Sequence, residues 1–349
     1  MTSFTLLDDG RPVAVLAVAD GDRVRIPPAA LREALGWELR PQGLCRGERC
    51  VPVRDRAALS DERGVDLAAF ARAIDRPLAL DAAERAAALG SSAAERTAQL
   101  ASLEAPDFAL PDLSGRVHRL SDQRGRKVLL LAYASWCGCR EDLPAWQALY
   151  EELGAEGFVP ITVALDQSPA DARPYIERAR PTHPSLIDTE HRVAELYHVV
   201  NVPTQIWIDE AGRIVRPNDT QFGTDTFTAF HGKRSGPYLA ALRGWVREGR
   251  GVLDEDTARR HQLLPTPETQ LARAHRALAW WLHRQGRTEA AERHFARAAE
   301  LSPGDWTIRR GAMPIRGENP MGPKFFELAK EGVPRYPMEA LPPDGPGAG

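Results

Sequence analysis

The sequence lacks long hydrophobic runs, carries little net charge and contains few cysteines. No window reaches the roughly 18 apolar residues that a transmembrane helix requires, so the 349-residue chain is predicted to have no membrane span. Its formal net charge of −3 gives no argument for binding nucleic acid or a membrane surface. Four cysteines are too few for a structural disulfide framework in so long a chain, which favours catalytic, redox-sensing or metal-binding roles.

The start of the sequence also lacks the features of an export signal. Residues 1–10 contain no basic side chain, and the apolar segment over residues 12–19 is too short and begins too late. We therefore expect a cytoplasmic protein. Apolar residues make up 43% of the chain and charged residues 27%, which is typical of globular proteins, and the length predicts two or more domains.

The chemistry of the chain is concentrated in one stretch, residues 128–144. The apolar run over residues 128–132 has the length of one buried strand, and from Leu143 onward apolar residues recur at helical spacing. Cys137 and Cys139 are therefore predicted at the turn between a buried strand and the N-terminus of a helix. Thiolates are stabilised at such a position, where cysteine pKa values fall to roughly 3.5–7.5. This placement suggests thiol–disulfide exchange.

The same stretch resembles the thioredoxin-like superfamily, in its branch of TlpA- and ResA-like thiol–disulfide oxidoreductases. The matching residues are Trp136-Cys137, Cys139-Arg140 and Asp142-Leu143-Pro144. The resemblance implies a thioredoxin-like domain in which Cys137 attacks and Cys139 resolves the mixed disulfide. It also implies a partner protein or small molecule that carries a thiol or disulfide, and neither a cofactor nor a metal is expected.

The motif departs from the family pattern by one residue, because Cys-Gly-Cys replaces Cys-x-x-Cys. Residues two apart in a helix point about 200° away from each other, so the pair needs an irregular turn to form a bridge. Gly138 supplies the backbone freedom for that turn. We expect a tight bridge that is more oxidising than that of thioredoxin.

Other residues are predicted to support this site. Arg140 favours a thiolate at Cys137. In Val202-Pro203-Thr204, the proline occupies the position of the family's cis-proline, which implies a cis bond that faces Cys137 and a loop that holds the partner chain. The alternative is an ordinary proline at the start of a strand. Asp166 ends the strand predicted over residues 158–165, where it could assist proton transfer to a thiol or simply form a turn.

Cys45 and Cys50 form a second pair, in a Cys-x4-Cys loop that contains arginines. The pair is interpreted either as two free thiols or a local structural bridge, or as a second redox pair or half of a zinc site. Combined with Cys137 and Cys139 it could make a four-thiolate site. If oxidised, its Cα atoms should lie roughly 4.4–6.8 Å apart.

The pattern of elements predicts an α/β protein with a thioredoxin-like central domain. Residues 269–303 fit a single tetratricopeptide-like repeat, which is expected to pack on flanking helices or on another chain, and any antiparallel helix pair is the alternative. The predicted regions are a small α/β module over 1–80, a helical connector over 81–104, the thioredoxin-like domain over 105–250, a tetratricopeptide-like helical region over 251–310 and an irregular, partly disordered tail over 311–349.

Two other functions stay open beside the oxidoreductase. A peroxiredoxin-like peroxide reductase would have Thr or Ser three residues before its reactive cysteine and a proline further upstream, but Ala134 and Leu130 occupy those positions. A metal-binding or scaffold protein would use the four cysteines and the tetratricopeptide-like helices for protein contact.

Overall fold

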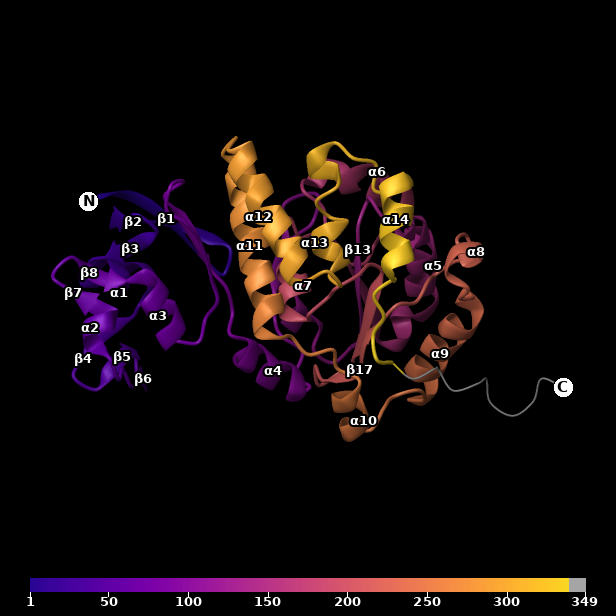
Figure 1. The fold of residues 1–349 in the computed structure, drawn as a ribbon. Helices are drawn as coiled ribbons and strands as arrows, with labels where there is room; N and C mark the ends of the chain where they lie inside the picture. The colour runs from indigo at the N-terminus through magenta and orange to yellow at the C-terminus, as the bar shows by residue number, and fades with distance from the viewer. Residues whose placement is uncertain (339–349) are drawn as a thin grey trace. The chain divides into compact units, whose positions relative to one another are not determined.

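The chain folds into two compact units, and each unit is built from two separate stretches of sequence. The structure, a computed structural model, describes residues 1–338 (Figure 1). Unit 1 comprises residues 1–96 and 265–303, and unit 2 comprises residues 97–264 and the chain from residue 304 onward. Among the described residues, no helix has both the length and the apolar character needed to cross a membrane.

Unit 1 is built on a seven-stranded sheet with the order β7-β8-β3-β2-β1-β10-β9. β1 and β10 run parallel, and the other neighbours are antiparallel. The strands are β1 (Thr2–Asp8), β2 (Arg11–Asp20), β3 (Arg23–Ile26), β7 (Ser60–Asp61), β8 (Gly64–Asp66), β9 (Leu78–Asp81) and β10 (Ala86–Leu89).

A small meander and short helices complete the first part of unit 1. The ring of Trp37 meets that of Phe70 edge-on at 6.1 Å, and both side chains are buried in the core of the unit. The elements are α1 (Pro28–Leu35), β4 (Glu38–Arg40), β5 (Gly43–Arg46), β6 (Arg49–Val51), α2 (Arg56–Leu59) and α3 (Leu67–Ala73), and α4 (Ala93–Ala101) lies at the boundary with unit 2.

The prediction of a helical connector over residues 81–104 is wrong in its first half, because the chain forms the strand β10 there. Alanine-rich sequence favours a helix by propensity. Here all four residues of β10 are buried, and the strand pairs with β1 on one side and β9 on the other. Tertiary pairing therefore outweighs local propensity. The small alanine side chains also allow α11 (Pro267–Arg284) to pack against this strand.

Residues 269–303 form the expected helical hairpin, but they do so as part of unit 1. α11 packs against α12 (Thr288–Leu301) and against β9 and β10. Residues 251–264, which include α10 (Glu255–Arg260), belong instead to unit 2, so the predicted helical region over 251–310 is divided between the two units. The identification of the hairpin as a tetratricopeptide repeat stays a prediction.

Cys45 and Cys50 are joined by a disulfide across the antiparallel pair β5 and β6. Their Cα atoms lie 4.1 Å apart, slightly below the range that we predicted. Because both sulfurs are used in this bond, the pair supplies no thiolate for a metal. The four-thiolate zinc site is therefore wrong for this structure.

Removing the disulfide should destabilise the meander of unit 1. For a closed loop of six residues, the chain-entropy model predicts a loss of about 2 kcal/mol. We expect this loss for the double variant Cys45→Ala/Cys50→Ala, measured by hydrogen exchange of the amides in β4 to β6. Wild-type protein reduced in the same buffer is the control and should behave alike, whereas unchanged protection in both would contradict the prediction.

Unit 2 contains a five-stranded sheet with the order β15-β14-β13-β16-β17. The strands β13, β14 and β15 are parallel, and β16 and β17 are antiparallel to their neighbours. Its strands are β13 (Lys127–Tyr133), β14 (Phe158–Ala164), β15 (Ser185–Ile187), β16 (Thr204–Ile208) and β17 (Ile214–Asp219), with a separate hairpin of β11 (Ala109–Pro111) and β12 (Val117–Arg119).

Helices pack on this sheet and protect its central strands, and all seven residues of β14 are buried. Trp146 of α5 meets Tyr238 of α9 edge-on, and Trp207 of β16 stacks on Trp245 of α9 at 4.7 Å. The helices of this part are η1 (Leu120–Gln123), η2 (Gly138–Asp142), α5 (Leu143–Leu153), η3 (Gly154–Glu156), α6 (Pro169–Ala179), α7 (Arg192–Leu196), α8 (Thr228–His231) and α9 (Ser235–Glu248).

Residues 304–338, which we call the C-terminal segment, are ordered into helices, although the sequence predicts an irregular, partly disordered tail over 311–349. The segment forms α13 (Trp306–Arg309), η4 (Pro314–Arg316) and α14 (Pro323–Glu331) (yellow in Figure 1). Trp306 and Phe325 are buried and meet edge-on at 5.9 Å. Apolar packing therefore holds this segment despite its many Gly and Pro residues. Residues 339–349, the end of the predicted tail, lie outside the described residues.

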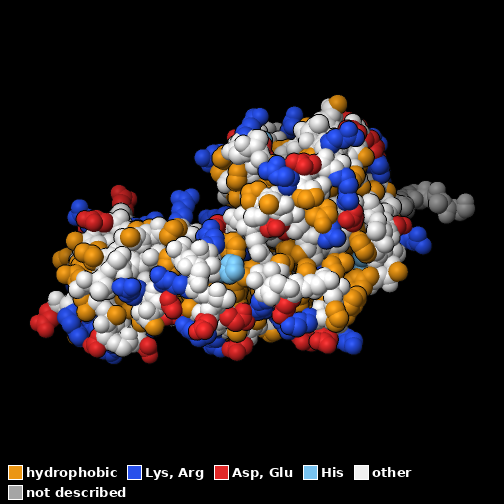
Figure 2. Space-filling model, turned by 90° about the horizontal axis from the view of Figure 1, so that it is seen from above, with side chains coloured by type: hydrophobic (Ala, Val, Ile, Leu, Met, Phe, Trp, Pro, Cys, Tyr) orange, Lys and Arg blue, Asp and Glu red, His pale blue; other side chains and the backbone are white. Residues whose placement is uncertain are grey.

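The surface carries both signs of charge. On the face shown in Figure 2, Lys and Arg side chains are interspersed with Asp and Glu, without a broad field of one sign. This distribution agrees with the small net charge of −3.

Candidate active site

The turn that follows β13 holds both free cysteines. Cys137 is the N-cap of η2, and its Sγ accepts a hydrogen bond from the backbone N–H of Cys139 at 3.4 Å. Both thiols are reduced and buried, with 6% and 3% of the residues exposed. η2 is a 3-10 helix that leads into α5, so the irregular turn expected from the Cys-Gly-Cys spacing is present.

Gly138 allows another side chain to approach this turn closely. A Cβ placed on Gly138 would lie 2.7 Å from the ring of Phe227, a distance too short for ordinary contact. The aromatic ring thus lies directly over the backbone between the two cysteines. Phe227 is the N-cap residue of α8, which follows β17.

Pro203 lies opposite Cys137, and its bond to Val202 is cis. The Sγ–H of Cys137 donates to the carbonyl oxygen of Val202 at 3.5 Å. Thr204 begins β16, and its hydroxyl donates to the carbonyl oxygen of Asn201 at 2.7 Å. Since β16 pairs with β13, the sheet itself brings this loop to the cysteine turn.

The environment separates the pKa values of the two thiols. Burial raises the pKa of Cys137, but hydrogen bonds with Cys139 and the charge of Arg310 outweigh it and lower the pKa to about 7. Burial raises the pKa of Cys139 well above its usual value, and the hydrogen bond and charge of Cys137 add to this increase. Cys137 is therefore the thiol that ionises first, which suits it to attack a disulfide.

Asp166 fixes the backbone just before the cysteines. Its carboxylate accepts hydrogen bonds from the N–H of Ser135 at 3.0 and 3.1 Å and from the hydroxyl of Ser135 at 2.6 Å. The indole N–H of Trp136 donates to the carbonyl oxygen of Leu165 at 3.2 Å. Both contacts fasten the end of β13 to the end of β14. Burial raises the pKa of Asp166 to about 6.

This raised pKa predicts a pH dependence of stability. The folded protein binds the proton of Asp166 more tightly than the unfolded chain does, so its contribution to stability is present below about pH 4 and is lost as the pH rises through about 6. The shift corresponds to about 3 kcal/mol. Asp166→Asn should therefore flatten the unfolding free energy between pH 4 and 6, measured by urea unfolding. Glu177→Gln on the surface of α6 is the control, and an Asp166→Asn curve that follows it would contradict the prediction.

Arg140 holds the turn. Its guanidinium donates to the carbonyl oxygen of Ser135 at 2.5 Å and lies 4.7 Å from the centre of the Tyr175 ring. The sequence prediction that Arg140 favours the Cys137 thiolate stays a prediction, and Arg310 is an arginine whose charge lowers this pKa. Through its bond to Ser135, Arg140 supports the backbone of the site.

Sequence reasoning missed two contributions from the C-terminal segment. Arg310 donates from its guanidinium to the carbonyl oxygen of Trp136 at 3.2 Å. The hydroxyl of Tyr336 accepts from the N–H of Val200 at 3.0 Å and lies 2.8 Å from the hydroxyl of Thr204. Neither residue belongs to a local motif, because each reaches the site from more than a hundred residues away in the sequence.

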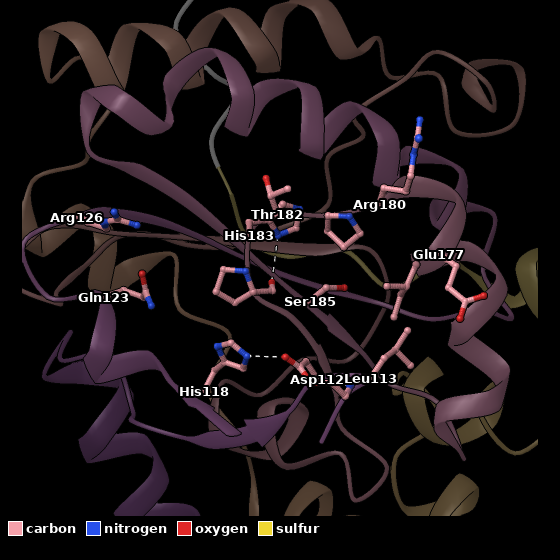
Figure 3. Close-up of a pocket in the computed structure, with 14 residues that line it drawn as sticks. Asp112, Leu113, His118, Gln123, Arg126, Glu177, Arg180, Thr182, His183 and Ser185 are labelled. Atoms are coloured by element: carbon pink, nitrogen blue, oxygen red, sulfur yellow. Dashed lines mark hydrogen bonds and ion pairs between the residues drawn. The ribbon is translucent and has the colours of Figure 1, made fainter. Parts of the chain in front are cut away.

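A separate cavity of unit 2 lies away from this turn and contains no cysteine. It measures about 660 Å³ and is lined by residues that include His118, His183 and Ser185 (Figure 3). Ser185 begins β15, so the cavity lies toward the amino ends of the parallel strands, whereas the cysteines follow the carboxyl end of β13. Nε2 of His118 lies 2.8 Å from Asp112, and burial lowers the pKa of His183 to about 4.

A dithiol turn after a buried strand, opposite a cis-proline, defines a protein of the thioredoxin-like class. Residues 102–216 match the model of the AhpC/TSA family. The chain is 35% identical over 121 residues to thiol-disulfide oxidoreductase ResA of Geobacillus thermodenitrificans (strain NG80-2), which covers 34% of this chain and 70% of that protein. It is 36% identical over 127 residues to the thioredoxin-like protein YneN of Bacillus subtilis (strain 168), covering 35% and 72%.

Among solved structures, the chain is similar to the exposed lipoprotein thioredoxin Etrx1 of Streptococcus pneumoniae strain TIGR4. The identity is 34% and the TM-score 0.31, with 34% of this chain and 90% of that chain covered. The chain belongs to the family of ResA-like thiol–disulfide oxidoreductases, and it is an oxidoreductase of this kind. The family match ends at residue 216, so the C-terminal segment lies outside it.

Proposed function

We propose that Cys137 and Cys139 are the redox pair of this oxidoreductase and that they act on the disulfide of a partner protein. The observation that carries the proposal is the position of the Cys137 sulfur, which lies 3.5 Å from the carbonyl oxygen before the cis-proline and has a pKa lowered to about 7. A thiol with a pKa near the ambient pH combines a substantial thiolate fraction with good nucleophilicity.

The proposed exchange has two steps. The Cys137 thiolate attacks one sulfur of the partner disulfide, the partner S–S bond breaks, and the departing sulfur takes a proton. Cys139 then loses its proton and attacks the Cys137 sulfur of the mixed disulfide. The partner leaves as a dithiol, and two electrons have passed from the protein, which now carries the Cys137–Cys139 bond. The reverse sequence oxidises a partner dithiol.

The loop around Pro203 is the proposed contact for the partner chain. The carbonyl oxygen of Val202 points to Cys137, and it is an acceptor that a backbone N–H of the partner could use once the thiolate has formed. Thr204 and the cis bond keep this loop in place. The hairpin of α11 and α12 is a further proposed surface for protein contact.

A cytoplasmic location, which the sequence predicts, is also proposed. The Cys45–Cys50 bond weighs against it, because disulfides persist mainly in oxidising compartments. Cell fractionation tests the location: the protein should be recovered with the cytoplasmic fraction, and recovery with exported proteins would refute it.

Trapping identifies the partner. A Cys139→Ser variant should complete the first attack but leave the mixed disulfide unresolved, so partners remain bound to Cys137 and can be identified by mass spectrometry after alkylation. A Cys137→Ser/Cys139→Ser variant is the matched control. Adducts in both variants would exclude Cys137 as the attacking thiol, and adducts of small thiols alone would exclude the protein partner.

A further inference from the structure

Arg310 is a buried cation beside the reactive cysteine. Only 4% of the residue is exposed. Its guanidinium donates to the carbonyl oxygens of Trp136 at 3.2 Å and Pro320 at 3.0 Å. The group also lies 5.3 Å from the centre of the Trp136 ring and 4.1 Å from that of Phe325. These contacts hold the charge at the residue that immediately precedes Cys137.

Among residues 1–338, Arg310 forms no ion pair with a carboxylate. Burying a cation is costly unless an anion or hydrogen-bond acceptors compensate for the lost water. Carbonyl oxygens and aromatic rings supply part of this compensation. The thiolate of Cys137, whose pKa the charge of Arg310 lowers, is the anion that the arrangement fits.

We propose that Arg310 is a positioning residue that stabilises the Cys137 thiolate, and that the C-terminal segment delivers it to the active site. The proposal deepens the proposed function, on which it rests. It assigns a role in the exchange reaction to a segment that lies beyond the matched family region.

The C-terminal segment is fastened to the cis-proline loop on two sides of Arg310. The N–H of Trp306 donates to the carbonyl oxygen of Val200 at 2.7 Å, and the N–H of Val200 donates to the hydroxyl of Tyr336 at 3.0 Å. Tyr336 also contacts Thr204. The loop opposite Cys137 and the cation beside it are therefore held by one segment, and the segment must be docked for Arg310 to act.

The test is the pH dependence of Cys137 alkylation in the reduced full-length protein, with iodoacetamide as the probe and peptide mapping as the readout. Arg310→Gln keeps a side-chain N–H donor and removes the charge. In this variant, the pH at which alkylation reaches half of its maximal rate should rise by about one unit, because an opposite charge at close range shifts a pKa by about that much or more. From a wild-type value of about 7, the rate at pH 7 then falls about fivefold. Arg310→Lys restores the charge and should give an intermediate midpoint.

Arg309→Gln is the matched control, since it removes the adjacent arginine, which pairs with Glu331 instead. A midpoint of Arg310→Gln equal to that of this control would overturn the proposal. If Arg310→Gln does not fold by circular dichroism, Arg310→Met decides, because it also removes the charge and keeps a long unbranched side chain, and a midpoint equal to that of Arg309→Gln would overturn the proposal. A change in alkylation rate without a change in midpoint would indicate only altered access and would also overturn it. Whether wild-type Cys137 and Cys139 undergo a reversible redox transition is measured separately, by titration of the protein in glutathione buffers, so failure of the proposed function is distinguished from failure of this proposal.

Discussion

Cys137→Ser should reduce thiol–disulfide exchange to the background rate, a loss on the order of a thousandfold or more. The serine hydroxyl stays protonated where the thiol ionises near pH 7, so the attacking group disappears while the size of the side chain hardly changes. The measurement is the rate at which the reduced protein cleaves an aromatic disulfide reagent, followed by absorbance at pH 7.

Cys139→Ser is the matched variant for that experiment. It should retain the first attack and release one equivalent of the aromatic thiol, because Cys137 keeps Arg310 and the loop around Pro203. The wild-type protein should release two equivalents as Cys139 resolves the intermediate. Equal activity of Cys137→Ser and wild type would exclude Cys137 as the nucleophile, and two equivalents from Cys139→Ser would exclude Cys139 as the resolving thiol.

Trp207→Ala should destabilise unit 2 by about 3–5 kcal/mol, the cost of removing a large aromatic side chain from a packed core. The ring of Trp207 is buried and stacked on Trp245, and its indole N–H donates to the hydroxyl of Tyr238 at 2.9 Å. Trp207 belongs to β16, the strand that follows Pro203, so the loss should also loosen the loop opposite Cys137.

Thermal unfolding of the full-length variant gives the measurement. The transition of unit 2 should shift to a markedly lower temperature, since a natural domain has only about 5–15 kcal/mol of stability. Val117→Ala, at a position that is 57% exposed in the same unit, should change stability by less than about 0.5 kcal/mol. Similar unfolding of the two variants would show that the aromatic stack has no special role.

Local patterns predicted the central sheet well. The apolar run at residues 128–132 and the strand expected over 158–165 correspond to β13 and β14, because a fully buried parallel strand needs only apolar side chains over a short length. The helix periodicity after Leu143 likewise gave α5. The order of strand, cysteines and helix fixed the position of Cys137 without any long-range information.

The residues that tune the site could not be found in this way. Arg310 lies 174 residues beyond Trp136 in the sequence, and Tyr336 lies 132 residues beyond Thr204. Gly and Pro around them indicate turns and give no sign of packing. β10 was missed for a related reason, since its alanines form a strand only because β1 and β9 flank it. Long-range pairing decides each of these cases.

A redox titration of the reduced and oxidised protein in glutathione buffers tests the central claim most directly, with the thiols of Cys137 and Cys139 quantified by mass spectrometry at each potential. A two-electron transition of this pair is predicted, with a midpoint above the value of about −270 mV for thioredoxin because the Cys-Gly-Cys ring is short. The transition should be absent in Cys137→Ser and in Cys139→Ser. A wild-type protein in which the two cysteines never form a bond across the titration would contradict the account.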